Sequence, residues 1–279
     1  MKYALVSPVC NSNDRCEGLL TNLLDSIVWG GYSDKCPVVI CWEPDCSEDY
    51  RASFEEKYPF ITSLRPEGDF NLNFTKNSNR GLKYVHKELP DCGGLVLCNM
   101  DLTLPSAVYL EKIFNAGISS PTAEHIDGSA WAKVQFLNQK NSPGCPCNKT
   151  ISQGIPTDSR KFAFFCTWIH RDVIDRIGHL DSTTFTSSFE DDDYVIRAIL
   201  AGFPSQQSPV RIHHELKNRD ASRGEPISTT NSYTVNDLGV SGYKFIEKWK
   251  LPFGLDKHSE FADYIIENWK GDPPLEYFD

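Results

Sequence analysis

Residues 189–198 read FEDDDYVIRA, and four carboxylates, Glu190 to Asp193, stand together there at the start of an expected helix. Acidic residues in a first helical turn interact favourably with the helix dipole, by about 0.3–1 kcal/mol each, and two would satisfy that account. Four crowded carboxylates repel one another, and such groups usually neighbour a cation or accept a proton. We therefore expect one of them to face a pocket and the others to hold neighbouring loops.

Two further polar sites end apolar runs elsewhere in the chain. Asp101 follows the run 94–98, and the pair His213-His214 follows the run 209–212. Ligands of open α/β sheets bind at the carboxyl ends of strands, where an aspartate can hold Mg²⁺ or Mn²⁺. The simpler alternatives are an aspartate that caps the turn after it and histidines that serve only the structure.

Strand and helix signals alternate through the first half of the chain, which is typical of a parallel sheet with crossover helices. In this half the expected strands cover 3–9, 38–42, 61–64 and 94–98, and the expected helices cover 17–28, the segment capped by Ser47, 79–89 and 105–115. In the second half strands are expected at 130–137, 162–169 and 209–212, and helices at 171–177, 190–200 and 258–269. The segments 117–161 and 215–242 otherwise indicate irregular structure.

The composition narrows the class of protein. The 279 residues carry a net charge of −10, which argues against non-specific nucleic-acid binding. No run reaches the roughly 18 apolar residues of a membrane span, and residues 1–9 turn polar too soon for a signal peptide, so the chain is expected to be cytoplasmic. The ten cysteines are scattered, and the one close pair, Cys145 and Cys147, is expected to lie in a loop as free thiols.

Taken together, these pieces resemble the GT-A glycosyltransferases of family 2, especially the rhamnosyltransferase-like branch. The resemblance covers about residues 1–215 and is more specific in its second half. The matching motifs, in chain order, are Asn79-Arg80-Gly81, Asn99-Met100-Asp101, residues 170–181 (HRDVIDRIGHLD), Phe189-Glu190-Asp191-Asp192-Asp193, Arg197-Ala198, Ala201-Gly202-Phe203 and His213-His214.

The resemblance implies a fold and a division of the chain. The fold would be a single α/β domain of the GT-A type, which is Rossmann-like, with a mixed, mostly parallel central sheet flanked by helices. Residues 1–215 would form the catalytic domain, with 1–116 as its nucleotide-binding half and 117–215 as its acceptor and catalytic half. Residues 216–279 would be a C-terminal extension packed on that domain.

The resemblance also implies roles for single residues. Asp191 would be the catalytic base, and Asp101 would hold Mn²⁺ or Mg²⁺ with His213, or less favourably His214, as a second contact. Glu190 and Asp192 would support the acceptor or the loops, and the extra acid Asp192 keeps the choice of base open. Expected donor contacts are Pro8, either Glu43 or Asp45, Lys76, Asn79, Arg80, Asn99, Met100 and Trp168. For Trp168 a place in the core or in a pocket wall is the competing interpretation, and Asn99 stands where many relatives have Asp.

The implied activity is that of an inverting, metal-dependent glycosyltransferase, which moves a sugar from a nucleotide-sugar, with UDP favoured, to a hydroxyl of a glycan acceptor on an oligosaccharide or glycoprotein. The segment 117–161 and the cysteine content are also similar to small glycosyltransferases of large algal viruses, among them a xylosyltransferase, which suggests UDP-xylose. The rivals are a sugar nucleotidyltransferase and a non-catalytic carbohydrate-binding module. The first normally needs a glycine-rich phosphate loop after the first strand, and residues 9–17 contain no glycine.

Overall fold

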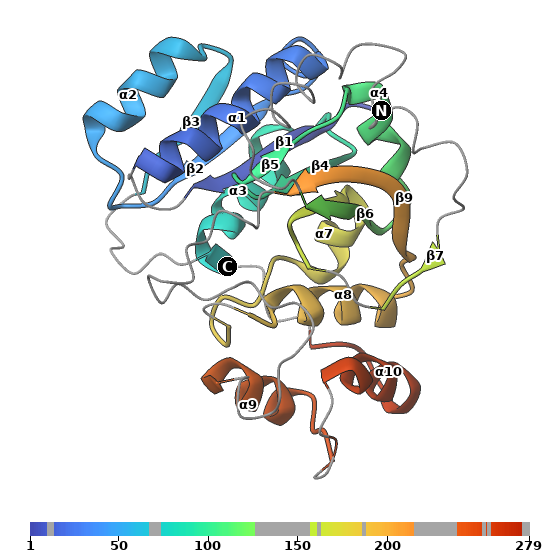
Figure 1. Cartoon of the computed structure of the whole chain (residues 1–279). Helices are drawn as coiled ribbons and strands as arrows, with labels where there is room; N and C mark the ends of the chain where they lie inside the picture. The colour runs from blue at the N-terminus through green and yellow to red at the C-terminus, as the bar shows by residue number, and fades with distance from the viewer. Residues whose placement is uncertain are drawn as a thin grey trace.

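The computed structural model in Figure 1 describes residues 1–9, 14–66, 74–125, 157–160, 163–185, 188–214, 239–252, 255 and 258–274. Its centre is one nine-stranded sheet in the order β3-β2-β1-β4-β8-β6-β9-β5, with β7 paired to β9. The strands are β1 (Ala4–Val9), β2 (Val38–Trp42), β3 (Ile61–Leu64), β4 (Gly94–Cys98), β5 (Leu102–Thr103), β6 (Ile118–His125), β7 (Thr157–Asp158), β8 (Cys166–His170) and β9 (Ser205–His214). The expected strand 130–137 and the cysteine pair at 145 and 147 lie outside the described residues.

The sheet is mixed and mostly parallel, as the sequence predicted. Strands β3, β2, β1 and β4 are parallel to one another. Strand β8 is antiparallel to both β4 and β6, and β6 is parallel to β9, so β6 and β9 run in the direction of the first four strands. Strands β5 and β7 are antiparallel to β9.

Helices cover both faces of the sheet, so β1, β2 and β4 are buried on both sides and read as continuous apolar runs. One core joins the sheet to α1 (Asp14–Gly30), α2 (Glu48–Lys57), α4 (Ala107–Leu110) and the 3₁₀ turn η1 (Glu111–Ile113). A second core joins the opposite face to α3 (Phe74–Glu88), α7 (Arg171–Ile177) and α8 (Glu190–Leu200). None of the helices in the described ranges combines the length and apolarity needed to cross a bilayer.

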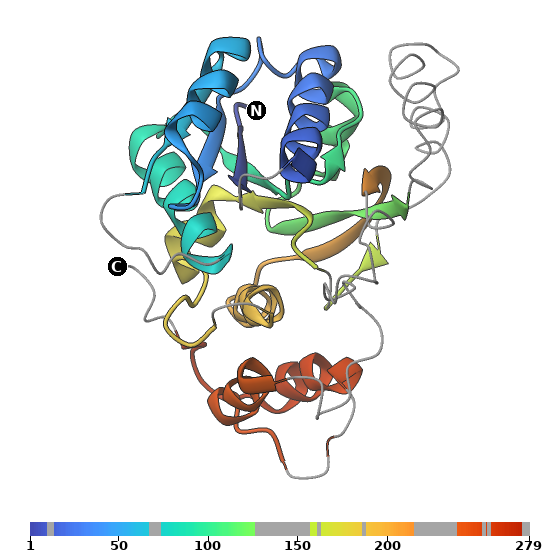
Figure 2. The same cartoon turned by 60° about the vertical axis from the view of Figure 1, so that its left-hand side comes forward.

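A third core lies outside the sheet layers. Helices α9 (Gly239–Lys248) and α10 (His258–Asn268) stack against the outer side of α8, as Figures 1 and 2 show. Their buried anchors Phe245, Trp249 and Phe261 pack with Phe185 and Ile196. These contacts agree with the expected packing of a C-terminal extension, although the boundary at residue 215 stays a prediction.

Three sequence predictions are wrong in part. The helix expected to begin at Asn79 begins at Phe74, because its polar first turns are buried and bonded: Asn77 Nδ2 donates to the carbonyl of Cys41 at 2.7 Å. The segment from 117 begins with the eight-residue strand β6, whose register shifts around Pro121, a residue with no N–H to donate. The segment 215–242 ends inside α9, whose glycines obscured the helical pattern.

Helix α3 packs closely against the sheet because it has a glycine at the contact point. A Cβ built on Gly81 would lie 2.2 Å from Val6 Cγ1 and 2.9 Å from Cys41 Sγ. Such distances are not tolerated in a packed core, so a larger residue would push α3 away from β1 and β2. Because α3 carries Lys76, Asn79 and Arg80, this contact also sets the position of those side chains.

Replacing Gly81 with Ala is expected to lower the free energy of unfolding by about 1–3 kcal/mol, because overpacking outweighs the gain in helix propensity. The matched control is Gly18→Ala on α1, where a Cβ meets nothing within 4 Å. There the same change should raise stability by up to about 1 kcal/mol. Urea unfolding of both variants measures the difference, and equal effects at the two positions would contradict this account of α3.

Candidate active site

The carboxyl ends of four strands meet at one edge of the sheet. Strands β1, β2, β4 and β9 run in the same direction and end there at Val9, Trp42, Cys98 and His214. Strand β8 begins at the same edge, because Cys166 pairs with Cys98 in antiparallel register. Open α/β sheets bind ligands at this edge. Asp101 lies there, three residues after the end of β4.

Asp101 and His214 form a nearly buried pair at this edge. Their Oδ1 and Nε2 atoms lie 3.1 Å apart, and their side chains are 12% and 9% exposed. The pairing of β5 with β9 sets this contact, since Leu102, next to Asp101, lies opposite His214. Successive strand residues point to opposite faces, so the histidine against Asp101 is His214. The geometry therefore favours His214 as the partner of Asp101, and the choice of a metal contact between His213 and His214 stays a prediction.

The dipeptide Phe164-Phe165, which precedes β8, joins this pair to the acidic turn of α8. The ring of Phe165 stacks on the ring of His214, with centroids 5.3 Å apart and planes at 15°. Its carbonyl accepts a hydrogen bond from the Asn99 amide at 2.8 Å. The backbone amide of Phe164 binds the carboxylate of Asp191. The segment Asn99-Met100-Asp101, His214 and the acidic turn are therefore linked through this dipeptide, which the sequence had not singled out.

Two carboxyls of the acidic turn hold protons unusually well. Burial, reinforced by the charge of Asp192, raises the pKa of Asp191 to about 7, although the amides of Asp192 and Phe164 that bind it act in the opposite sense. Burial and the charge of Asp191 raise the pKa of Glu190 to about 8. Glu190 is 6% exposed, and its Oε2 has no hydrogen-bond partner among the described residues. Such a pair is typical of acid–base sites.

The backbone in front of this turn is strained. Ser188 and Phe189 both have positive φ, at 66° and 71°, which non-glycine residues rarely adopt. Each such residue costs about 1–3 kcal/mol, and strain of this kind clusters at functional sites. The strain therefore adds an independent indication that the start of α8 serves a function.

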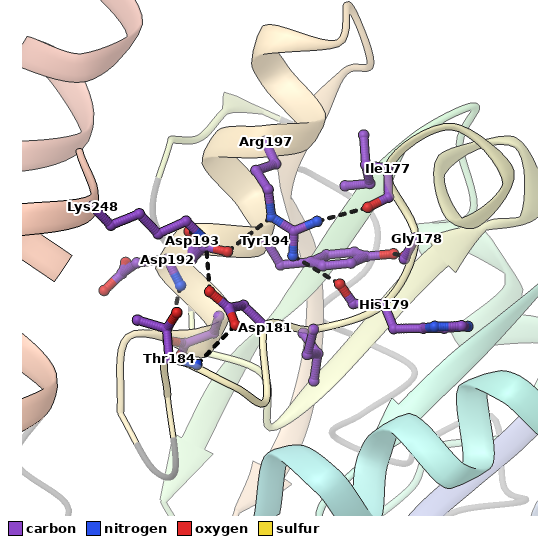
Figure 3. A network of polar contacts seen from close by, with 12 residues as sticks. Ile177, Gly178, His179, Asp181, Thr184, Asp192, Asp193, Tyr194, Arg197 and Lys248 are labelled. Atoms are coloured by element: carbon purple, nitrogen blue, oxygen red, sulfur yellow. Dashed lines mark hydrogen bonds and ion pairs between the residues drawn. The ribbon is translucent and has the colours of Figure 1, made fainter. Parts of the chain in front are cut away.

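The fourth acid of the turn serves the structure. Asp193 is fully buried and accepts from Arg197 Nε at 2.8 Å, and Lys248 Nζ lies 2.6 Å from its other oxygen (Figure 3). Arg197 also donates to the carbonyls of Ile177 and His179, at 2.7 and 2.8 Å. Asp193 and Arg197 thus tie α8 to α7 and to the loop after it, which leaves the other three acids of the turn for other roles.

Several expected donor contacts lie at the same edge. Pro8 pairs with Cys41 near the end of β1, and Glu43 and Asp45 follow β2 directly. Arg80 reaches from α3 to the end of β2, where its Nη1 donates to the carbonyl of Trp42 at 2.9 Å. Lys76 lies in the first turn of α3 and is half-buried. Pro8, Glu43, Asp45 and Arg80 thus lie at or next to the ends of β1 and β2.

Asn99 lies at the same edge, directly after the last residue of β4. Its Oδ1 is buried and has no hydrogen-bond partner among the described residues, although its backbone amide is bonded to Phe165. A buried amide oxygen without a partner is costly, so this atom is suited to meet a ligand.

Three other expected donor contacts have the surroundings of core residues. Asn79 exchanges two hydrogen bonds with the backbone of Leu180, at 2.8 and 2.9 Å. Met100 is buried in the first core. Trp168 is fully buried, donates to the carbonyl of Asn115 at 2.9 Å and stacks on Phe114 with centroids 4.0 Å apart. The core interpretation of Trp168 fits these contacts, and donor binding by these three residues stays a prediction.

Comparison with known proteins supports the fold. No protein-family model and no curated protein matches the sequence. Among solved structures, the chain is similar to S. aureus TarS 1-349 in complex with UDP-GlcNAc, with a TM-score of 0.56 and 14% identity over 95% of this chain and 70% of that one. It is also similar to GalNAc-T7 with UDP, GalNAc and Mn²⁺, with a TM-score of 0.54 and 12% identity over 94% of this chain and 54% of that one. The fold is therefore GT-A-like, as in these glycosyltransferases.

The raised pKa values of Glu190 and Asp191 predict how stability depends on pH. An unfolded glutamate has a pKa of about 4.3, so at neutral pH the folded state binds protons that the unfolded state has released. The free energy of unfolding contributed by these groups is then highest at low pH and decreases as the pH rises toward about 8. Glu190→Gln should remove much of this decrease, as measured by urea unfolding at pH 5, 6, 7 and 8.

The control for this measurement is Glu56→Gln, at an exposed position on α2. It should leave the pH dependence as in the unmodified chain. A Glu190→Gln variant that loses stability with pH as steeply as the unmodified chain would show that this carboxyl is not protonated in the folded state.

Proposed function

We propose that the protein is an inverting, metal-dependent glycosyltransferase, which transfers a sugar from a UDP-sugar to a hydroxyl of a glycan acceptor. The observation that carries the proposal is the convergence of Asp101, His214 and Asp191 through Phe164-Phe165 at the carboxyl edge of a GT-A-like sheet. A nucleotide diphosphate needs a site at this edge, and a hydroxyl nucleophile needs a base next to it.

Asp191 is the proposed base. A general base is most effective when its pKa lies near the working pH, and burial brings the pKa of Asp191 to about 7. The Phe164 amide fixes the orientation of the carboxylate, so that one oxygen can accept the proton of the acceptor hydroxyl as it attacks the anomeric carbon. A single displacement of this kind inverts the configuration at that carbon. Glu190, neutral below about pH 8, can donate a hydrogen bond to the acceptor, and Asp192 is the proposed support of the neighbouring loop.

The residues at Asp101 fit a hard divalent cation. Mn²⁺ and Mg²⁺ are commonly held by one or two protein side chains, with substrate phosphates and waters as the remaining ligands. Asp101, His214 and the unpartnered Oδ1 of Asn99 supply a donor set of this size, and no cluster of three or more His, Cys, Asp or Glu occurs within the described ranges. A cation bound there would neutralise charge on the leaving diphosphate.

The donor nucleotide would lie across the ends of β1 and β2. Glu43 or Asp45 is the proposed partner of the uridine, and Arg80 and Lys76 supply positive charge for the phosphates. UDP is favoured because both solved structures of similar fold named above contain it or a UDP-sugar. The donor panel to be tested therefore contains UDP-GlcNAc and UDP-GalNAc. UDP-xylose is added because the sequence resemblance suggests it.

Asp191→Asn is expected to lower transfer by about 10²–10⁴-fold, the usual contribution of a general base, with donor binding unchanged. Mn²⁺-dependent release of UDP from the donor panel measures transfer, and the thermal shift with UDP plus Mn²⁺ measures binding. The matched control is Asp192→Asn, one residue along the same turn, which should retain activity within about tenfold. Full transfer by the Asp191 variant would reject the base, and a loss confined to the Asp192 variant would assign the role to its neighbour.

His214→Ala should weaken Mn²⁺ binding more than His213→Ala does, because His214 Nε2 lies 3.1 Å from Asp101 Oδ1. The loss of His214 is expected to reduce the affinity for Mn²⁺ by at least about 10–100-fold, which is the usual cost of losing even an outer-shell partner of a metal site. Electron paramagnetic resonance of free Mn²⁺, titrated with each variant in the presence of UDP, measures this. Equal affinities for the two variants would contradict the proposed ligand set. If neither UDP nor Mn²⁺ changed the melting temperature, the result would instead favour a carbohydrate-binding module.

A further inference from the structure

Helix α9 contacts the start of α8 on both sides of Asp191. The ring of Phe245 packs against that of Phe189, the residue just before α8, with centroids 5.0 Å apart. Three residues later on α9, Lys248 Nζ lies 2.6 Å from Asp193 Oδ1, and the neighbouring Trp249 donates Nε1–H to the same oxygen at 3.0 Å. Asp191 is therefore held between two anchors that belong to the C-terminal helices.

These anchors also hold the strained backbone in front of α8. Phe189 keeps a positive φ although it is not glycine, and such conformations persist only where the surroundings fix them. Its side chain is 5% exposed and lies in the core shared with α9 and α10. Its carbonyl accepts from the amide of Asp193 at 2.9 Å. The packing on Phe245 and the bonds to Asp193 together keep this turn in one shape.

Lys248 supplies the charge that balances this region. Asp181 and Asp193 are both fully buried, and Lys248 Nζ lies 2.9 Å from the first and 2.6 Å from the second. Asp193 is also paired with Arg197, so two buried acids face two cations, as Figure 3 shows. Without Lys248 the two buried acids would face one cation, Arg197, so part of their charge would be uncompensated and the turn is expected to loosen.

The charged groups at the contact between α9 and the acidic turn, within the described part of the chain, come from three elements. They are Glu190, Asp192, Asp193 and Arg197 on α8, Asp181 and His179 on the loop before it, and Lys244 and Lys248 on α9. Acids outnumber cations in this set. Lys248 supplies one of the positive charges in this set, through its contacts with Asp181 and Asp193.

We propose that α9 acts as a clamp on the acidic turn of α8, and that Lys248 is a positioning residue for Asp191. The inference rests on the proposed function, since it makes the C-terminal helices part of the site that carries the base. Lys248 acts through Asp193 and Asp181 and contacts no substrate.

The test compares Lys248→Met, Lys248→Arg and the control Lys250→Met, an exposed lysine two residues further on. Lys248→Met should lower kcat by about tenfold or more with KM little changed, since a small displacement of a base is costly. It should also move the acid limb of the kcat/KM profile to higher pH by about half a unit or more, because the acidic turn that contains Asp191 loses one positive charge. Lys248→Arg should restore both, and Lys250→Met should match the unmodified chain.

Hydrogen exchange of the amides of residues 188–193 gives a readout that needs no activity. These amides should exchange faster in Lys248→Met than in Lys248→Arg, and if the chain shows no transfer at all, this comparison alone decides the inference. Should Lys248→Met fail to fold, Lys248→Gln, which keeps a hydrogen-bond donor without charge, replaces it. Unchanged exchange at 188–193, or a lower rate with an unmoved acid limb, would overturn the positioning role.

Discussion

The site depends on a short connection, the dipeptide Phe164-Phe165 at the start of β8. It lies at the edge where the parallel strands end, because β8 pairs antiparallel with β4. The backbone amide of Phe164 binds the carboxylate of Asp191, and the ring of Phe165 stacks on the ring of His214. Because one residue of the dipeptide binds Asp191 and the next contacts His214, the dipeptide sets the separation of the two halves of the site. The chemistry proposed here requires this separation to be small and constant.

The acidic turn shows how neighbouring residues of one type acquire different properties. Asp193 is surrounded by Arg197 and Lys248, so its charge is compensated in the interior. For Glu190 and Asp191 no ion pair with a cation is seen within the described residues, and desolvation raises their pKa values. Asp193 holds the turn in place, and Glu190 and Asp191 are the acids proposed to take part in proton transfer.

The sequence predicts best where a local pattern has one physical cause. The strands at 38–42 and 94–98 are buried on both faces, so their apolar runs marked them to the residue. The helices at 171–177 and 190–200 were likewise predicted to the residue.

Elements set by long-range pairing were missed. Strand β6 is polar, with its serines buried against other strands, and the first turns of α3 are held by side chains that reach the sheet. The same limit applies to the site. Sequence order brought out Asp101, Asp191 and the histidine pair, but which histidine contacts Asp101 follows from the register of β5 on β9.

The central claim is that one pocket holds a cation and a nucleotide diphosphate beside Asp191. The most direct measurement is anomalous diffraction from crystals grown with UDP and Mn²⁺. We predict a manganese peak coordinated by Asp101 and His214, with the diphosphate bound to the cation. The carboxylate of Asp191 should lie on the side of the terminal phosphate that the sugar and the acceptor would occupy. A manganese peak away from Asp101, or a diphosphate separated from Asp191 by the body of the sheet, would contradict it.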